Sequence, residues 1–219
     1  MRESQQRQGF FITFEGGEGS GKSSQVKALA TFLGEQNRSC VVTREPGGTA
    51  EAEKIRNLLV EREGGNWSAI EECLLLFAAR AHHVRSLIAP ALARGDLVIS
   101  DRFTDSTRAY QGYGLGVPLE HINALNQLCL DGFEPDLTIL LDVPAGLGLE
   151  RSKGRLAAQS STEDKYENLD LAFHERMRAG FLELAAQNPQ RFVVVDAAQG
   201  IEVIQNQVAL IVAERLGLG

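Results

Sequence analysis

The chain has 219 residues and carries 22 Lys and Arg against 29 Asp and Glu, a formal net charge of -7. Its 43% hydrophobic and 23% charged residues are typical of a globular protein, and the length favours a single α/β domain spanning residues 1–219. The acidic balance argues against binding nucleic acid or an anionic membrane through a basic surface, and no apolar run approaches the roughly 18 residues of a membrane span.

Five apolar runs, rich in β-branched residues, predict strands at 9–15, 39–44, 97–101, 136–143 and 191–196. Helical spacing predicts helices at 22–36, 50–63, 68–94, 168–186 and 200–216. Pro90 is expected to interrupt the 68–94 helix. The stretch 152–164 is the least patterned and is expected to be a disordered loop or a lid. Alternating strands and helices predict a five-stranded parallel sheet flanked by helices in three layers.

The N-terminal residues and the cysteines predict the compartment. Residues 1–8 form a polar tail without the apolar stretch of a signal peptide. Cys40, Cys73 and Cys129 are far apart and show no metal-ligand spacing. We therefore expect reduced thiols and a cytoplasmic protein.

A glycine-rich loop follows the first predicted strand and opens the first predicted helix. Residues 16–23 read GGEGSGKS and fit the phosphate-binding pattern G-x-x-x-x-G-K-[ST], the P-loop. Such a loop turns backbone N–H groups towards phosphate oxygens, while Lys22 reaches the β- and γ-phosphates and Ser23 binds Mg²⁺. The expected ATP-binding residues in this part of the chain are Gly16, Gly17, Glu18, Gly19, Ser20, Gly21, Lys22, Ser23 and Ser24.

Charged residues end two other predicted strands, at the sheet edge where α/β proteins bind ligands. Asp101 is expected to contact Mg²⁺ directly or through water, and Arg102 can donate two hydrogen bonds to a phosphate. A turn after the second predicted strand explains the sequence Pro-Gly-Gly, but it does not explain why the charged residues Arg44 and Glu45 come directly before it. Arg80 lies on an apolar helical stretch and needs an anionic partner if it is buried.

The hydroxyls, Tyr110, Gln111 and glycines of 104–114 can hold a planar base. The four histidines show no ligand spacing, and His82 and His83 are expected on a solvated helix face.

Together with the P-loop, several short motifs make the sequence resemble the thymidylate kinase family from about residue 10 to residue 216. These motifs are REPGGT (44–49), FAAR (77–80), DRFTDST (101–107), AYQG (109–112), FHERMR (173–178) and FLELA (181–185). The resemblance implies a P-loop kinase fold, with ATP and Mg²⁺ used to convert dTMP to dTDP for dTTP synthesis. It also implies direct in-line transfer without a covalent enzyme intermediate, and a homodimer.

The resemblance assigns dTMP binding to Glu18, Arg44, Glu45, Phe77, Arg80, Arg102, Thr107, Tyr110 and Gln111. Arg44 and Arg80 would contact the phosphate or the base, and Arg102 would bridge the acceptor phosphate and the transferred group. Either Phe77 or Leu76 would stack on thymine.

The remaining roles follow from the same resemblance. Thr107 and Gln111 would read the base edge, and Tyr110 would lie over the deoxyribose. Glu18 would lie near the sugar or a metal-bound water, and Glu45 would position the acceptor's metal and phosphate.

A basic lid over residues 151–167 is the last implied feature. In the resembled family such a lid neutralises charge when the P-loop itself holds no arginine, and here the loop carries Glu18. Arg155 is the expected catalytic cation, with Lys153 and the ATP-binding Arg151 supporting it. Lys165 stands where the family often has arginine, and 156–163 is longer than usual.

Two alternatives remain open at this stage. One is another nucleoside-monophosphate kinase, acting on dUMP, guanylate or adenylate. The other is a P-loop ATPase switch that hydrolyses ATP in response to a protein or DNA partner.

Overall fold

The computed structural model describes residues 9–60, 65–159 and 165–218, with the backbone alone for 155–159. It contains a five-stranded sheet of order β2-β3-β1-β4-β5 in which every paired strand is parallel. The strands are β1 (Phe10–Glu15), β2 (Cys40–Arg44), β3 (Leu97–Asp101), β4 (Leu137–Asp142) and β5 (Phe192–Asp196). The predicted parallel α/β sheet is confirmed. The expected tail, 1–8, lies outside the described residues.

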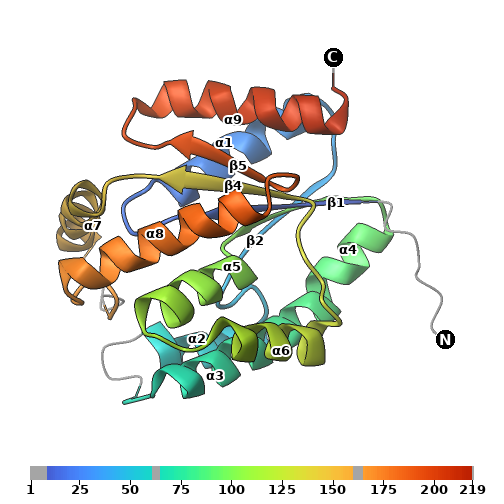
Figure 1. Ribbon diagram of the computed structural model, residues 1–219. Coiled ribbons are helices and arrows are strands. Elements are labelled where there is room, and N and C mark those ends of the chain that lie inside the picture. Colours follow the sequence, from blue (N-terminus) through green and yellow to red (C-terminus); the bar gives the residue numbers. More distant parts are fainter. Residues whose placement is uncertain (1–8, 61–64, 160–164, 219) are drawn as a thin grey trace.

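Helices cover both faces of the sheet (Figure 1). One face is covered by α1 (Lys22–Glu35) and α9 (Ile201–Leu216). On the other side lie α2 (Ala50–Val60), α3 (Ala69–His83), α4 (Ala89–Ala93), α5 (Thr104–Thr107), α6 (Leu119–Leu130) and α8 (Leu171–Gln187). No helix within the described ranges is long and apolar enough to cross a membrane.

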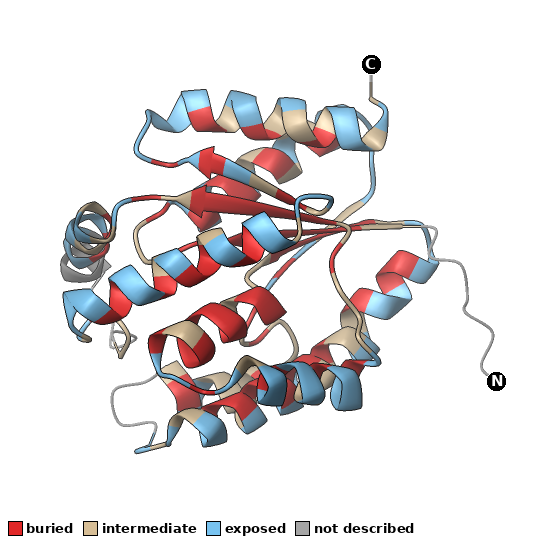
Figure 2. Ribbon diagram, viewed as in Figure 1, coloured by how far each residue is buried: buried red, intermediate tan, exposed pale blue. Residues whose placement is uncertain are grey.

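The alternation of side chains along the strands explains the two cores. Ile12 and Phe14 of β1 face the α1–α9 layer, whereas Phe11 between them faces α3 and α4. All three side chains are fully buried, and the strands form the buried centre of Figure 2. Because the sheet is covered on both faces, its strands are almost entirely apolar until they reach their carboxyl ends.

The interruption expected near Pro90 occurs just before that residue. α3 ends at His83, a π-helical turn η1 (Val84–Ile88) follows, and α4 carries Pro90 in its first turn. Proline has no N–H to donate and its ring clashes with the carbonyl four residues earlier, so the wider π turn accommodates it.

The sequence pattern does not predict α5, the π-helical segment η2 (Arg108–Gly114) that follows it, or α6. In addition, α7 (Ala145–Gln159) includes much of the stretch 152–164 that was expected to be a disordered loop or a lid. Three glycines in α7 obscure its periodicity, but one of them has a packing role. A Cβ on Gly148 would lie 2.4 Å from the Glu18 carbonyl oxygen, so only glycine lets α7 approach the P-loop this closely.

Candidate active site

The P-loop connects β1 to α1, and three of its glycines have positive φ angles. Gly16, Gly19 and Gly21 have φ of 137°, 66° and 90°, values that glycine adopts without a steric penalty. Lys22 folds back over the loop, and its Nζ donates to the carbonyls of Gly16 at 3.0 Å and Gly17 at 2.8 Å. Burial, together with the charge of Arg102, lowers the pKa of Lys22 to about 8.

Of the serines in and next to the P-loop, one is buried and two line an open cleft. Ser20 is buried and donates to the Gly17 carbonyl, whereas Ser23 and Ser24 line the cleft. Ser23 donates to a carboxylate oxygen of Asp101 at 2.8 Å, at the carboxyl end of β3. The structure thus places next to each other the two residues that were each expected to contact Mg²⁺.

That donor set suits Mg²⁺. A hydroxyl and a carboxylate at the cleft provide hard oxygen ligands, and Mg²⁺ usually takes only one or two such ligands together with substrate phosphates and water. Within the described ranges, no cluster of three or more His, Cys, Asp or Glu forms an all-protein metal cage. Ser23 and Asp101 thus fit a metal held jointly with a nucleotide.

Arg102 occupies the centre of the site. Its Nη1 donates to the Gly16 carbonyl at 3.0 Å, while its Nη2 donates to Glu18 at 3.0 Å and to the Tyr110 hydroxyl at 2.8 Å. Its guanidinium also stacks over the Tyr110 ring, 4.8 Å from the centroid. Burial alone would lower the pKa of Arg102, but Tyr110 and nearby carboxylates hold that pKa above its ordinary value. Arg102 therefore stays charged.

A second arginine is fixed from behind by a carboxylate. Arg80 is 2% exposed, and its Nε donates to Glu45 at 2.6 Å, which supplies the anionic partner expected for a buried arginine. The opposite oxygen of Glu45 lies 2.9 Å from His83 Nδ1, so Glu45 is held between two side chains of α3. Arg80 also donates to Thr107 at 3.1 Å.

His83 corrects the expectation of a solvated histidine pair. It is fully buried and contacts Thr43 as well as Glu45, whereas His82 remains partly exposed. The reason is helical phase: His83 lies three residues after Arg80 and shares its inward face.

A cleft of about 560 Å³ joins these groups, a size that suits small-molecule ligands. Four of the expected cations line it: Lys22, Arg44, Arg80 and Arg102. Its far wall contains Tyr110 and Gln111 from the π-helical segment η2 (Arg108–Gly114). Leu76 lines the cleft, whereas Phe77 is buried in the core behind Arg80. Of the two stacking candidates, the structure thus places Leu76 at the cleft.

The basic residues around the expected lid lie in different surroundings. Arg151 on α7 donates to the Ala197 carbonyl at 2.7 Å, in the loop after β5. Lys165 forms an ion pair with the buried Glu72 at 2.6 Å. Lys153 is exposed. The side chain of Arg155 and residues 160–164 lie outside the described residues, so the catalytic role of Arg155 stays a prediction.

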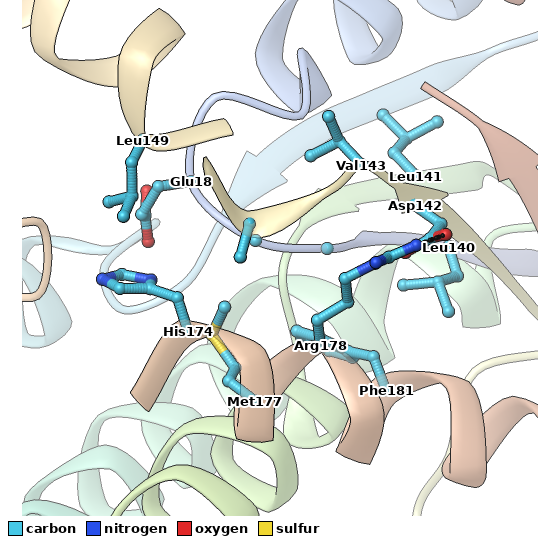
Figure 3. A pocket seen from close by; sticks show the side chains of 13 residues that line it. Glu18, Leu140, Leu141, Asp142, Val143, Leu149, His174, Met177, Arg178 and Phe181 are labelled. Carbon is cyan, nitrogen blue, oxygen red and sulfur yellow. Dashed lines mark hydrogen bonds and ion pairs between the residues drawn. The ribbon is translucent and has the colours of Figure 1, made fainter. Parts of the chain in front are cut away.

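A second, much smaller cavity lies behind the P-loop, between β4, α7 and α8 (Figure 3). It measures about 10 Å³, roughly room for one water molecule. At one end of the cavity, Arg178 donates two hydrogen bonds to the carboxylate of Asp142. His174 lines the other end. This cavity is too small for a nucleotide, so the large cleft is the candidate active site.

A P-loop at the carboxyl edge of a parallel sheet, facing a cleft lined by arginines, defines an α/β P-loop kinase. The thymidylate kinase family model matches residues 14–208. The chain is 48% identical to the thymidylate kinase of Caulobacter vibrioides, over 96% of this chain and 99% of the relative. It is 50% identical to that of Cereibacter sphaeroides, over 90% and 91%.

A solved structure agrees with the sequence relatives. The thymidylate kinase of Ehrlichia chaffeensis superposes with a TM-score of 0.73 and 36% identity, covering 93% of this chain and 98% of the other. The chain belongs to the thymidylate kinase family.

Proposed function

We propose that this enzyme transfers the γ-phosphoryl group of ATP to dTMP, giving dTDP and ADP. The observation that carries the acceptor assignment is Arg80. Its Nη1 is buried and has no hydrogen-bond partner among the described residues, although Arg80 lines the cleft. An unpaired buried donor is costly, and a ligand acceptor such as the C4 carbonyl of thymine would satisfy it.

The ATP phosphates would bind the P-loop and Lys22. Binding would draw Lys22 Nζ from the loop carbonyls to phosphate oxygens, exchanging dipole partners for charged ones. Ser23 and Asp101 would hold Mg²⁺, which would neutralise phosphate charge and orient the transferring group.

The acceptor would lie across the cleft, with Arg44 and Arg102 near its phosphate. Arg44 is anchored to Glu53 yet remains 56% exposed, so it can reach a ligand. Transfer needs alignment and charge neutralisation more than a nucleophilic side chain. We therefore propose direct attack by an oxygen of the acceptor phosphate on the γ-phosphorus, with no covalent enzyme intermediate.

An acceptor panel tests the proposal. Purified enzyme with Mg²⁺ and ATP is assayed for ADP release with dTMP, dUMP, dCMP, GMP or AMP. We expect the strongest release with dTMP, and little release without an acceptor. Preference for another monophosphate, or rapid hydrolysis without one, would contradict it; the second result would favour an ATPase switch.

We also propose a homodimer, which exposed apolar side chains on α2 and α3 support. Leu58, Ile70 and Leu74 are 41%, 42% and 53% exposed. Light scattering on the purified protein should give twice the mass of the chain. A cytoplasmic location is likewise proposed, because three free thiols suit a reducing compartment.

A further inference from the structure

A buried carboxylate on α3 lies beside the cleft without a role in the mechanism above. Glu72 is 2% exposed and accepts three hydrogen bonds. One oxygen accepts from Lys165 Nζ at 2.6 Å. The other accepts from Gln111 Nε2 at 2.9 Å and from the Tyr166 hydroxyl at 3.0 Å. Glu72 thus joins α3, η2 and the turn at 165–168.

These contacts fix which way the Gln111 amide points. A carboxylate only accepts hydrogen bonds, so the amide nitrogen must face Glu72. The single proton of Tyr166 is donated to Glu72, so the Tyr166 oxygen accepts the second N–H of Gln111 at 3.0 Å. Both amide protons are therefore engaged by described residues. The carbonyl oxygen is the polar atom that Gln111 has left for a ligand in the cleft it lines.

We infer that Glu72 is a positioning residue for base discrimination, holding Gln111 with its acceptor available to the nucleotide base. The inference rests on the proposed function. A thymine ring offers an N3–H donor to such an acceptor, and its C4 carbonyl suits the Arg80 donor. A cytosine ring reverses both groups: its N3 is an acceptor and its C4 amino group a donor. Glu72 therefore sets selection for an imide base without touching the substrate.

Replacing the carboxylate by its amide tests this directly. In Glu72→Gln the new side chain both donates and accepts, so Gln111 is no longer restricted to one orientation. The kcat/KM for dTMP and for dCMP are measured in the same assay. We expect the dTMP-to-dCMP ratio to fall at least about tenfold, the size of one buried hydrogen-bond preference. Glu120→Gln, the same change on an exposed residue of α6, should leave the ratio unchanged.

The dTMP-to-dCMP ratio of kcat/KM distinguishes a positioning role of Glu72 from a merely structural one. A merely structural role would lower kcat/KM for both substrates equally and leave the ratio intact, and that result would overturn the inference. In a Gln111→Ala background, Glu72→Gln should have no further effect on the ratio. Inactivity of the wild-type enzyme towards dTMP would instead contradict the proposed function.

A second variant keeps the test decisive if Glu72→Gln does not fold. Glu72→Met with Lys165→Met replaces the buried ion pair by apolar side chains of similar length, a change that proteins often tolerate. The same loss of discrimination is expected, with circular dichroism as the folding check. A folded double variant with the wild-type ratio would also overturn the inference.

Discussion

Arg102 Nη2 lies 3.0 Å from Glu18 Oε1, and this ion pair connects the residue after β3 to the middle of the P-loop. Arg102 has φ of 73°, in the left-handed region that costs a residue other than glycine about 1 kcal/mol. Such strain persists where surrounding contacts hold the residue in place. The backbone turn aims the guanidinium at the P-loop, where donor and acceptor phosphates would meet.

Arg102→Lys is therefore expected to lose most of the activity even though it keeps the charge. Lysine lacks the planar fork that contacts Glu18, Tyr110 and Gly16 together, and it cannot stack in the same way. We expect kcat to fall by about tenfold or more for Lys and further for Ala, by several kcal/mol of barrier. The measurement is the ADP-release rate at saturating dTMP. Wild-type turnover in Arg102→Ala would remove the residue from the catalytic set.

Lys22→Ala should abolish most transfer while the protein stays folded. Its ammonium group donates to two P-loop carbonyls, and removing one such preorganised donor costs about 10²–10³-fold. Lys22 itself lines the open cleft, so water can fill the space that its side chain leaves. Activity and the thermal unfolding midpoint are compared with Lys54→Ala, an exposed change on α2. Loss of folding rather than of turnover would contradict the prediction.

The pKa of Lys22 predicts a pH dependence as well. Because that pKa is lowered to about 8, the free enzyme loses the Lys22 charge as pH rises through 8. kcat/KM for ATP reports protonation of the free enzyme, so it should fall above that pH. A profile that stays flat to pH 9.5 would contradict the assignment of Lys22 as the phosphate-binding cation.

The sequence predicted the sheet well because its signals are local. Buried parallel strands read as apolar runs, and the P-loop pattern fixes both its flanking elements. The sequence pattern does not predict α7, because glycines that allow close packing, such as Gly148, also weaken the helical periodicity. Its packing partner is the P-loop, more than a hundred residues earlier in the chain, which no local pattern reveals.

The site was only partly predictable for a related reason. Motifs pointed to the residues expected to contact phosphates, but not to Glu72 and His83, which contact Gln111 and Glu45 from α3. Glu72, Leu76, Arg80 and His83 lie within one 80° sector of α3, a stripe that helical geometry alone would have revealed. That Glu45 fixes Arg80 is a contact between β2 and α3, and depends on the fold.

Arg155→Ala should lower kcat more than it weakens dTMP binding. A lid cation that neutralises charge in the transition state stabilises that state more than the bound substrates. Lys153→Ala, two residues earlier on α7, is the matched control and should have the smaller effect. kcat and KM are determined separately for both variants. An unchanged kcat in Arg155→Ala would assign the role to another cation.

Glu15→Gln should remove part of the pH dependence of folding stability. Burial, reinforced by the charge of Asp105, raises the pKa of Glu15 from 4.5 to about 8. Between these values the folded protein keeps a proton that the unfolded chain has lost, so this contribution to stability declines as pH rises from 4.5 through 8. Glutamine mimics the neutral form and can still accept from the Phe103 N–H. The free energy of unfolding is measured by urea titration at pH 5, 6.5 and 8. Between these pH values it should decline less in Glu15→Gln than in wild type. In the exposed control Glu35→Gln, the free energy of unfolding should decline with pH as steeply as in wild type. Equal slopes in all three proteins would show that Glu15 is already ionised in the folded state at pH 5.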